Sequence, residues 1–253
     1  MRERLEADLF GSRQLQPVKR HRKKSAVGIV PAAGLGIRMG AGRPKQFLEV
    51  QGVPVLALTL RTLQECDAVD RIIVTAPKEA LVHCREEIVG KFGLDKVAAV
   101  VPGGRRRQDS VRRGLDAAGE GFDLAVIHDG VRPLAGCGLV EAVLRAAGEY
   151  GAAVAGLQAA ETVKEADESG RVLKTLDRSR IWLIQTPQAF SFEIIREAHD
   201  RAKRERWPEA TDDAALVEQL GVPVKIVPGL QQNIKVTIPA DLEMVRLFLE
   251  KNG

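Results

Sequence analysis

From residue 26 to about residue 158, short apolar runs alternate with segments in which apolar residues recur at helical spacing. The apolar runs are 26–31, 71–76, 96–101 and 123–129, partly β-branched and closed by Pro, Gly or Asp. The segments with helical spacing are roughly 53–66, 78–91, 107–118 and 137–149. This alternation predicts βαβ units and a mostly parallel sheet. The near-continuous apolarity of the strands indicates that helices cover both faces of the sheet.

The pattern changes after about residue 158. Residues 159–181 are polar, and the turn-like sequence ADESG separates two short β-prone runs, which predicts an exposed hairpin arm. Val163, Val172 and Leu173 would be poorly covered on a lone hairpin, so we expect the arm to form a dimer contact. Regular α/β sequence then resumes, with helices near 191–203, 211–220 and 239–251 and a strand near 223–228.

Composition is that of an ordinary globular chain. The 253 residues, 45% hydrophobic and 28% charged, suffice for one large α/β domain. No apolar run is long enough for a membrane span, and the first residues lack the apolar core of a secretory signal. The three cysteines, Cys66, Cys84 and Cys137, are widely spaced and form no CxxC pair. This spacing favours inert thiols in the cytoplasm over disulfides or a zinc site, and we expect no membrane partner.

The net charge of +4 is unevenly distributed. Residues 1–24 hold eight Lys and Arg against three acids, a net of +5, which leaves −1 for the remainder. We therefore divide the chain into a basic, disordered extension (1–24) and one folded domain (25–253) that includes the arm. The folded part has no excess positive charge, so we do not expect a nucleic-acid partner. Contact of the basic run 19–24 with nucleic acid or with a membrane surface is the alternative.

The strongest local motif is PAAGLGIRMGAGRPKQF at 31–47, directly after the first predicted strand. Its four glycines allow the backbone N–H groups to approach a ligand, and Arg38 and Lys45 add two cations, which predicts a polyphosphate cradle. It is not a dinucleotide fingerprint, because Met39 stands where GxGxxG requires its third glycine. Nor is it a Walker A loop, because Lys45 is followed by Gln46 and not by Ser or Thr.

This loop and several later blocks closely resemble the 2-C-methyl-D-erythritol 4-phosphate cytidylyltransferase family of isoprenoid biosynthesis. The blocks, in family order, are PAAGLGIRM with PKQ, GGRRRQDSV (103–111), IHDGVRP (127–133), ETVK (161–164), DRSRIW with QTPQAF (177–190), ATDDA (210–214) and NIKVT (233–237). The resemblance covers about residues 25–250. It implies a Rossmann-like α/β nucleotidyltransferase domain, a homodimer with exchanged β-arms, and Mg²⁺ as cofactor.

The resemblance also implies roles for individual residues. The catalytic cations are Arg38, Lys45 and Lys235. Nucleotide binding falls to Ala32, Ala33, Gly34, Gly104, Arg105, Arg107 and Ser110. Acceptor binding falls to Asp129, Arg132, Thr162, Arg178 and Thr186, of which Thr162 and Arg178 come from the partner subunit's arm and Asp129 also holds the metal. Three departures from the family pattern are Arg105, Gly130 and Glu161.

The chemistry needs such cations, because two anions must meet at one phosphorus. An acceptor phosphate oxygen attacks the α-phosphorus of CTP, and pyrophosphate leaves in line. The acceptor phosphate is already ionised, so no general base is required. His128 is expected to be a packed histidine. Asp212 and Asp213 are expected to be an N-cap or surface acids and are left outside the catalytic set. Two alternatives remain open: a ribitol 5-phosphate cytidylyltransferase and a non-catalytic nucleotide-binding protein.

Overall fold

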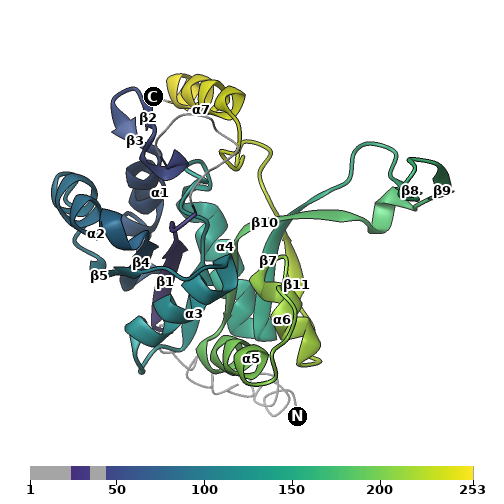
Figure 1. Ribbon diagram of the computed structural model, residues 1–253, viewed down its shortest axis with the longest axis horizontal. Helices are drawn as coiled ribbons and strands as arrows, with labels where there is room; N and C mark the ends of the chain where they lie inside the picture. Colours follow the sequence, from purple (N-terminus) through teal and green to yellow (C-terminus); the bar gives the residue numbers. More distant parts are fainter. Residues whose placement is uncertain (1–23, 35–43, 253) are drawn as a thin grey trace, which may run out of the picture.

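A seven-stranded sheet forms the centre of the protein (Figure 1). The structure is a computed structural model, and it describes residues 24–34 and 44–252. The strand order of the sheet is β11-β7-β10-β6-β1-β4-β5. The strands are β1 (Ala26–Pro31), β4 (Arg71–Ala76), β5 (Val97–Pro102), β6 (Leu124–Ile127), β7 (Ala152–Gln158), β10 (Trp182–Ser191) and β11 (Lys225–Pro228). Every neighbouring pair is parallel except the two that involve β10, which runs antiparallel to β6 and β7. The predicted mostly parallel sheet is confirmed.

Helices cover both faces of this sheet, as the apolarity of the strands predicts. One face carries α1 (Val55–Gln64), α2 (Leu81–His83) and α4 (Gly136–Tyr150); the other carries α3 (Arg107–Ala118), α5 (Phe192–Arg204) and α6 (Asp213–Gln219). Strand β1 shows the alternation, since Ala26 and Val30 pack with the first layer while Val27 and Ile29 pack with the second. All four side chains are buried, which explains why no polar residue interrupts the run.

The predicted elements agree with the structure apart from three differences. The helix expected at 53–66 begins at Val55, because 53–54 form β3 (Val53–Pro54), paired with β2 (Glu49–Val50). The helix expected at 78–91 is a helical stretch of mixed winding, with η3 (Lys78–Ala80) and η4 (Cys84–Gly90) on either side of α2. Strands β7 and β10 were not predicted as strands, since alanine and polar residues within them dilute the β signal.

A third, smaller apolar cluster holds the C-terminal segment against the body. Helix α7 (Pro239–Asn252) packs over the β2–β3 hairpin and the loop after β6, with Val131, Val236 and Val245 buried between them. The Val236 N–H donates to the Val131 carbonyl at 2.9 Å. This contact brings residue 235 beside the end of β6, although more than 100 positions separate the two in the sequence.

The predicted hairpin arm projects away from the body (Figure 1). Its strands β8 (Lys164–Ala166) and β9 (Val172–Thr175) pair with each other in a separate two-stranded sheet and are exposed along their length. A single turn, η5 (Arg178–Arg180), leads back to β10. The predicted basic extension lies outside the described residues except for Lys24, which donates to the Gly148 carbonyl. Within the described ranges, no helix is long and apolar enough to cross a membrane.

Candidate active site

A cavity opens where β1, β5 and β6 end, at the carboxyl edge of the parallel strands. It encloses roughly 660 Å³, including the solvent at its mouth. The residues that line it come from four loops: Pro31, Ala32, Ala33, Gly34, Lys45, Gln46, Gly104, Arg105, Arg106, Arg107, Ser110, Asp129, Val131 and Lys235. The carboxyl edge is where open α/β sheets bind their ligands, since loops from several strands converge there.

Asp129 lies at the centre of the charged groups in this cavity. Its side chain is only 8% exposed, and its two oxygens lie 2.9 Å from Arg107 Nε and 2.8 Å from Lys235 Nζ. Arg132 Nε is 3.9 Å away. Burial opposes ionisation of Asp129, but attraction to Arg107, Lys235 and Arg132 outweighs it and holds the pKa of this carboxyl well below its usual range. Asp129 therefore remains a carboxylate throughout the physiological pH range.

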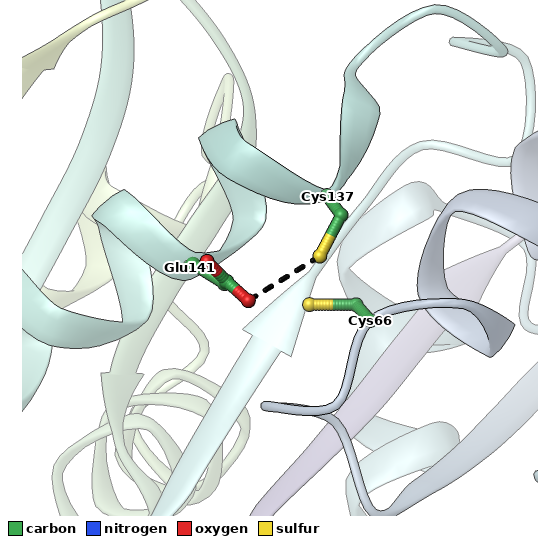
Figure 2. A group of neighbouring side chains, drawn as sticks. All are labelled: Cys66, Cys137 and Glu141. Carbon is green, nitrogen blue, oxygen red and sulfur yellow. Dashed lines mark hydrogen bonds between the residues drawn. The ribbon is translucent and has the colours of Figure 1, made fainter.

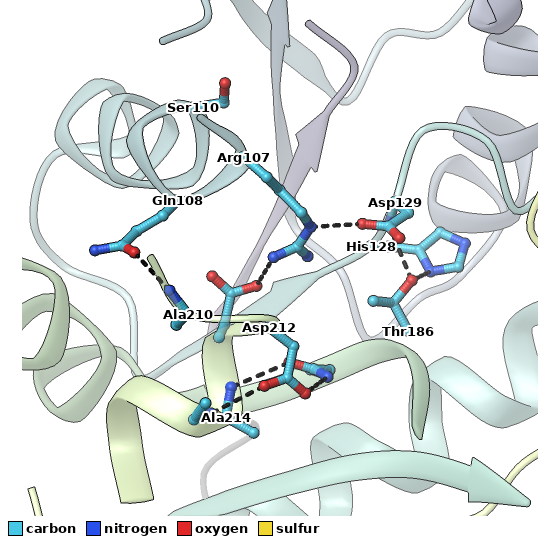
Figure 3. A network of polar contacts seen from close by, with 12 residues as sticks. Arg107, Gln108, Ser110, His128, Asp129, Thr186, Ala210, Asp212 and Ala214 are labelled. Atoms are coloured by element: carbon cyan, nitrogen blue, oxygen red, sulfur yellow. Dashed lines mark hydrogen bonds and ion pairs between the residues drawn. The ribbon is translucent and has the colours of Figure 1, made fainter. Parts of the chain in front are cut away.

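Arg107 reaches from the first turn of α3 and bridges two carboxylates (Figure 3). Besides Asp129, it donates through Nη1 to Asp213 Oδ2 at 2.7 Å. The Asp213 side chain is 1% exposed, and its other oxygen lies 3.1 Å from His199 Nε2 on α5. Burial works against both charges, yet the pKa of Arg107 is raised and that of Asp213 lowered by their mutual attraction. Asp213 thus positions Arg107, and through it Asp129.

A second chain of hydrogen bonds supports Asp129 from behind. Its backbone N–H donates to Thr186 Oγ1 at 3.0 Å, and that hydroxyl lies 3.1 Å from His128 Nδ1. His128 Nε2 lies 3.0 Å from the Arg132 carbonyl, which can only accept, so a neutral ring carries its proton on Nε2. The Thr186 hydroxyl then donates to Nδ1. Burial lowers the pKa of His128 to about 4, and the expectation of a packed histidine is confirmed.

Close backbone approach shapes the opposite wall of the cavity. A Cβ added at Gly103 would lie 2.1 Å from the Ala33 Cβ, and one at Gly104 would lie 2.2 Å from the Asp109 Cβ. The Gly104 N–H donates to Ser110 Oγ at 3.0 Å. Gly103 therefore lets the loop before α3 lie directly against the loop after β1, and Gly104 lets the same loop lie against the first turn of α3. The N-terminus of α3 borders the same cavity, since Arg106, Arg107 and Ser110 line it, and the positive end of the helix dipole favours an anionic ligand.

Two lysines complete the cationic lining. Lys45 follows the glycine-rich loop in η2 (Lys45–Phe47), and Lys235 precedes Val236 on the C-terminal segment. The neighbouring Asn233 is fully buried, and its carbonyl accepts from Arg132 Nη1 at 2.7 Å. The Asn233 side chain donates to the Thr186 carbonyl at 2.8 Å. These bonds fix the path of the chain that carries Lys235 into the cavity.

The structure brings most of the predicted site residues together. Those that line the cavity are Ala32, Ala33, Gly34, Lys45, Gly104, Arg105, Arg107, Ser110, Asp129 and Lys235. Arg132 contacts this group through Asp129, and Thr186 lies behind it. Thr162 and Arg178 are exposed on the arm, and neither lines the cavity. Arg38 lies outside the described residues.

Four polar residues that line or support the cavity, Gln46, Arg106, Asp213 and Asn233, were not among the site residues predicted from the sequence, nor were the apolar lining residues Pro31 and Val131. Gln46 and Arg106 line the cavity, while Asp213 and Asn233 are buried supports for Arg107 and Arg132. The view of Asp213 as a cap or surface acid was wrong, because its side chain points inward to Arg107; Asp212 is the cap, accepting from the Ala215 N–H. The sequence did carry a signal for two of them, because Asp213 lies in the motif block ATDDA and Asn233 lies in the motif block NIKVT.

Comparison with known proteins identifies relatives of this arrangement. The sequence model of the family described as "IspD: 2-C-methyl-D-erythritol 4-phosphate cytidylyltransferase" matches residues 26–251. A protein of that name from Syntrophus aciditrophicus is 46% identical over 229 residues, 90% of this chain and 97% of the relative. A second, from Pelotomaculum thermopropionicum, is 46% identical over 88% of this chain and 93% of its own length. The crystal structure of the Thermus thermophilus protein of that name is 34% identical, with a TM-score of 0.72 over 90% of this chain and 100% of its own.

Proposed function

The chain belongs to the 2-C-methyl-D-erythritol 4-phosphate cytidylyltransferase family, and we propose that it transfers CMP from CTP to 2-C-methyl-D-erythritol 4-phosphate with release of pyrophosphate. One observation carries the assignment of this chemistry to the cavity. An ionised carboxylate, Asp129, lies among Arg107, Arg132 and Lys235 in a cavity that also receives Lys45 and a helix N-terminus. Such a concentration of positive charge suits a triphosphate and a second phosphate held together.

CTP enters, in this proposal, with its base against the wall built by the two close-packed loops. Backbone groups of Ala32, Ala33 and Gly104 line that wall. The Ser110 hydroxyl accepts from Gly104 and donates to the Arg106 carbonyl at 3.2 Å, so it fixes the loop that faces the base. Gly34, Arg105 and Arg107 complete the predicted nucleotide-binding set. The triphosphate then extends toward Lys45 and the α3 N-terminus.

The reaction is an in-line displacement at the α-phosphorus. An oxygen of the acceptor phosphate forms the new bond to the α-phosphorus, and the bond from the α-phosphorus to the bridging oxygen of pyrophosphate breaks. Lys45 and Lys235 stabilise the charge on the α-phosphate and the leaving group, together with Arg38, which stays a prediction outside the described residues. In the structure Lys235 is paired with Asp129. Because the Lys235 side chain is more than a third exposed, it has room in this proposal to move from Asp129 to the phosphate.

A divalent cation fits the donor set around Asp129. Mg²⁺ takes oxygen ligands and retains several waters, so it needs one or two carboxylates plus phosphate oxygens from the substrate. Asp129 is a carboxylate that stays ionised in the cavity, and it would hold Mg²⁺ once Lys235 moves to phosphate. When bound, the ion neutralises charge on the triphosphate and orients it.

The acceptor is proposed to bind beside Arg132, with Thr162 and Arg178 supplied by the arm of a partner subunit. The arm itself supports this arrangement: Val172 and Leu173 on β9 are 59% and 60% exposed, so residues 24–34 and 44–252 leave both of them largely uncovered. A homodimer would cover these side chains and complete the acceptor site. The division into 1–24 and 25–253, and a cytoplasmic location, remain predictions of the sequence.

The direct test is turnover by the purified protein with CTP, Mg²⁺ and each candidate acceptor, followed by pyrophosphate release. We expect release with 2-C-methyl-D-erythritol 4-phosphate, abolished by EDTA and restored by Mg²⁺. Turnover only with ribitol 5-phosphate would transfer the assignment to that activity. CTP binding without turnover on either acceptor would indicate a non-catalytic nucleotide-binding protein.

Mixing two inactive variants tests the shared site. Lys45→Ala removes a cation from the cavity, and Arg178→Ala removes a group from the arm. If each active site combines one subunit's cavity with the other's arm, the mixed dimer holds one intact site and recovers activity after subunit exchange. No recovery, with exchange shown by a size-tagged subunit, would contradict the sharing of residues.

A further inference from the structure

Two cysteines and a glutamate that do not line the cavity lie close together at the start of α4 (Figure 2). Cys66 follows the end of α1, while Cys137 and Glu141 stand one turn apart near the start of α4. The two sulfurs and a Glu141 oxygen all lie within 4.8 Å of one another. The Cys137 thiol donates to Glu141 Oε1 at 3.5 Å. None of the three residues lines the cavity at the strand ends.

These three atoms lie close enough together to reach one tetrahedral metal ion, since none is more than 4.8 Å from another. Zinc binds thiolate sulfur at about 2.3 Å and carboxylate oxygen at about 2.0–2.2 Å, so neighbouring ligands around it lie roughly 3.5–3.8 Å apart. Cys137 and Glu141 are i and i+4 on one helix, which places both on the same face. Side-chain rotations therefore suffice to converge all three groups on one ion.

The surroundings hold the site in place and leave it a route to solvent. Cys66 is fully buried, and its carbonyl accepts from Lys96 Nζ at 2.8 Å and from the Val69 N–H at 3.0 Å. Those bonds fix the backbone from which the Cys66 thiol projects. Cys137 and Glu141 are half-buried, so an ion can enter from their side and keep a water as its fourth ligand.

We propose that Cys66, Cys137 and Glu141 bind one Zn²⁺, or a similar borderline-soft divalent cation, which staples the end of α1 to the start of α4. The thiolates exclude Mg²⁺, which requires oxygen ligands, so this ion is distinct from the one that serves the reaction. On binding, each S–H bond is replaced by a bond to zinc, and the proton passes to solvent. Because zinc displaces a proton from each thiol, affinity should rise with pH.

Zinc retention by the full chain tests the site. The reduced protein, without an affinity tag, is loaded with Zn²⁺ in excess Mg²⁺ to block oxygen sites, then dialysed into metal-free buffer and assayed for zinc. We expect one ion per chain and a higher melting temperature. Replacement by Co²⁺ should give sulfur-to-cobalt charge-transfer absorption and the intense visible bands of tetrahedral Co²⁺.

Matched cysteine variants locate the ion. Cys66→Ser and Cys137→Ser should each weaken Zn²⁺ binding by about 100-fold or more, because a thiolate supplies a large share of such a site's affinity. Glu141→Gln should cause a smaller loss, since water can replace an oxygen ligand. Cys84→Ala is the control, because Cys84 is buried elsewhere and should leave binding unchanged.

Three results would overturn the proposal: no zinc retained by the reduced wild type, binding unchanged in both serine variants, or a Cys66–Cys137 disulfide found in place of a metal site under reducing conditions. Turnover with CTP and Mg²⁺ by the variants shows that they are folded. That readout also separates this proposal from the proposed function, because zinc retention does not depend on the reaction.

Discussion

Asp213→Asn tests whether a buried ion pair outside the cavity sets the position of the catalytic groups. Asp213 is 1% exposed and lies 2.7 Å from Arg107 Nη1, and Arg107 in turn holds Asp129. The asparagine keeps the size and one acceptor oxygen but removes the charge. Arg107 then retains a single carboxylate partner and leaves part of its buried charge uncompensated.

The expected loss of stability follows from the burial of the Arg107–Asp213 pair. Removing one partner of a buried pair costs about 3–5 kcal/mol, and the surviving contact with Asp129 places this variant nearer to about 2–3 kcal/mol. A chain of this size loses about 2–4 °C in melting temperature for each kcal/mol, so we expect a decrease of roughly 5–10 °C. Because Asp129 is reached through Arg107, activity should fall roughly 10- to 100-fold, the range for residues that orient metal ligands.

Urea unfolding and pyrophosphate release measure the two effects. The matched control is Asp116→Asn, which removes the same type of partner from Arg112 at 2.8 Å on the surface of α3. That pair is exposed, with Asp116 45% accessible, so its loss should change stability by about 0.5 kcal/mol or less. Equal stability losses in the two variants, or wild-type activity in Asp213→Asn, would refute the positioning role.

Three further results are expected. Lys235→Ala should lower kcat/KM by about two to three decades, since it removes a cation from the transferred phosphate, and Lys235→Arg should recover part of the loss. Burial lowers the pKa of His128 to about 4 from its ordinary value near 6.5, so this residue should add about 3 kcal/mol to the free energy of unfolding as pH rises between these values, and His128→Gln should lack that contribution. Gly103→Ala should destabilise the protein by more than about 2 kcal/mol, because its Cβ would lie 2.1 Å from that of Ala33.

The Gly103→Ala result has a matched control in the same chain. Gly138→Ala adds a Cβ in open space on α4 and should be neutral or stabilising by up to about 1 kcal/mol. Unchanged kcat/KM in Lys235→Ala, an identical pH slope in His128→Gln, or wild-type stability in Gly103→Ala would each contradict the corresponding reasoning.

Local pattern determined much of this protein. Apolar runs and helical spacing predicted the parallel sheet, its two helical layers and the exposed arm. They could do so because the faces of a helix or strand that are buried determine which of its positions are apolar. The ordered motif blocks predicted the family and most residues of the cavity. Strands β7 and β10 escaped prediction, since their neighbours in the sheet, and not their own composition, make them strands.

Tertiary structure alone decided which distant groups meet. Asp213 reads as a helix cap from its position, yet packing of α6 against α5 turns it inward to Arg107 and His199. Cys66 and Cys137 lie 71 positions apart and lack the close spacing of a sequence-level zinc motif, so the sequence argued against a metal there. Packing of α1 beside α4 brings them within reach of one ion. Sequence spacing constrains contacts only within a helix or strand; longer contacts depend on how those elements pack.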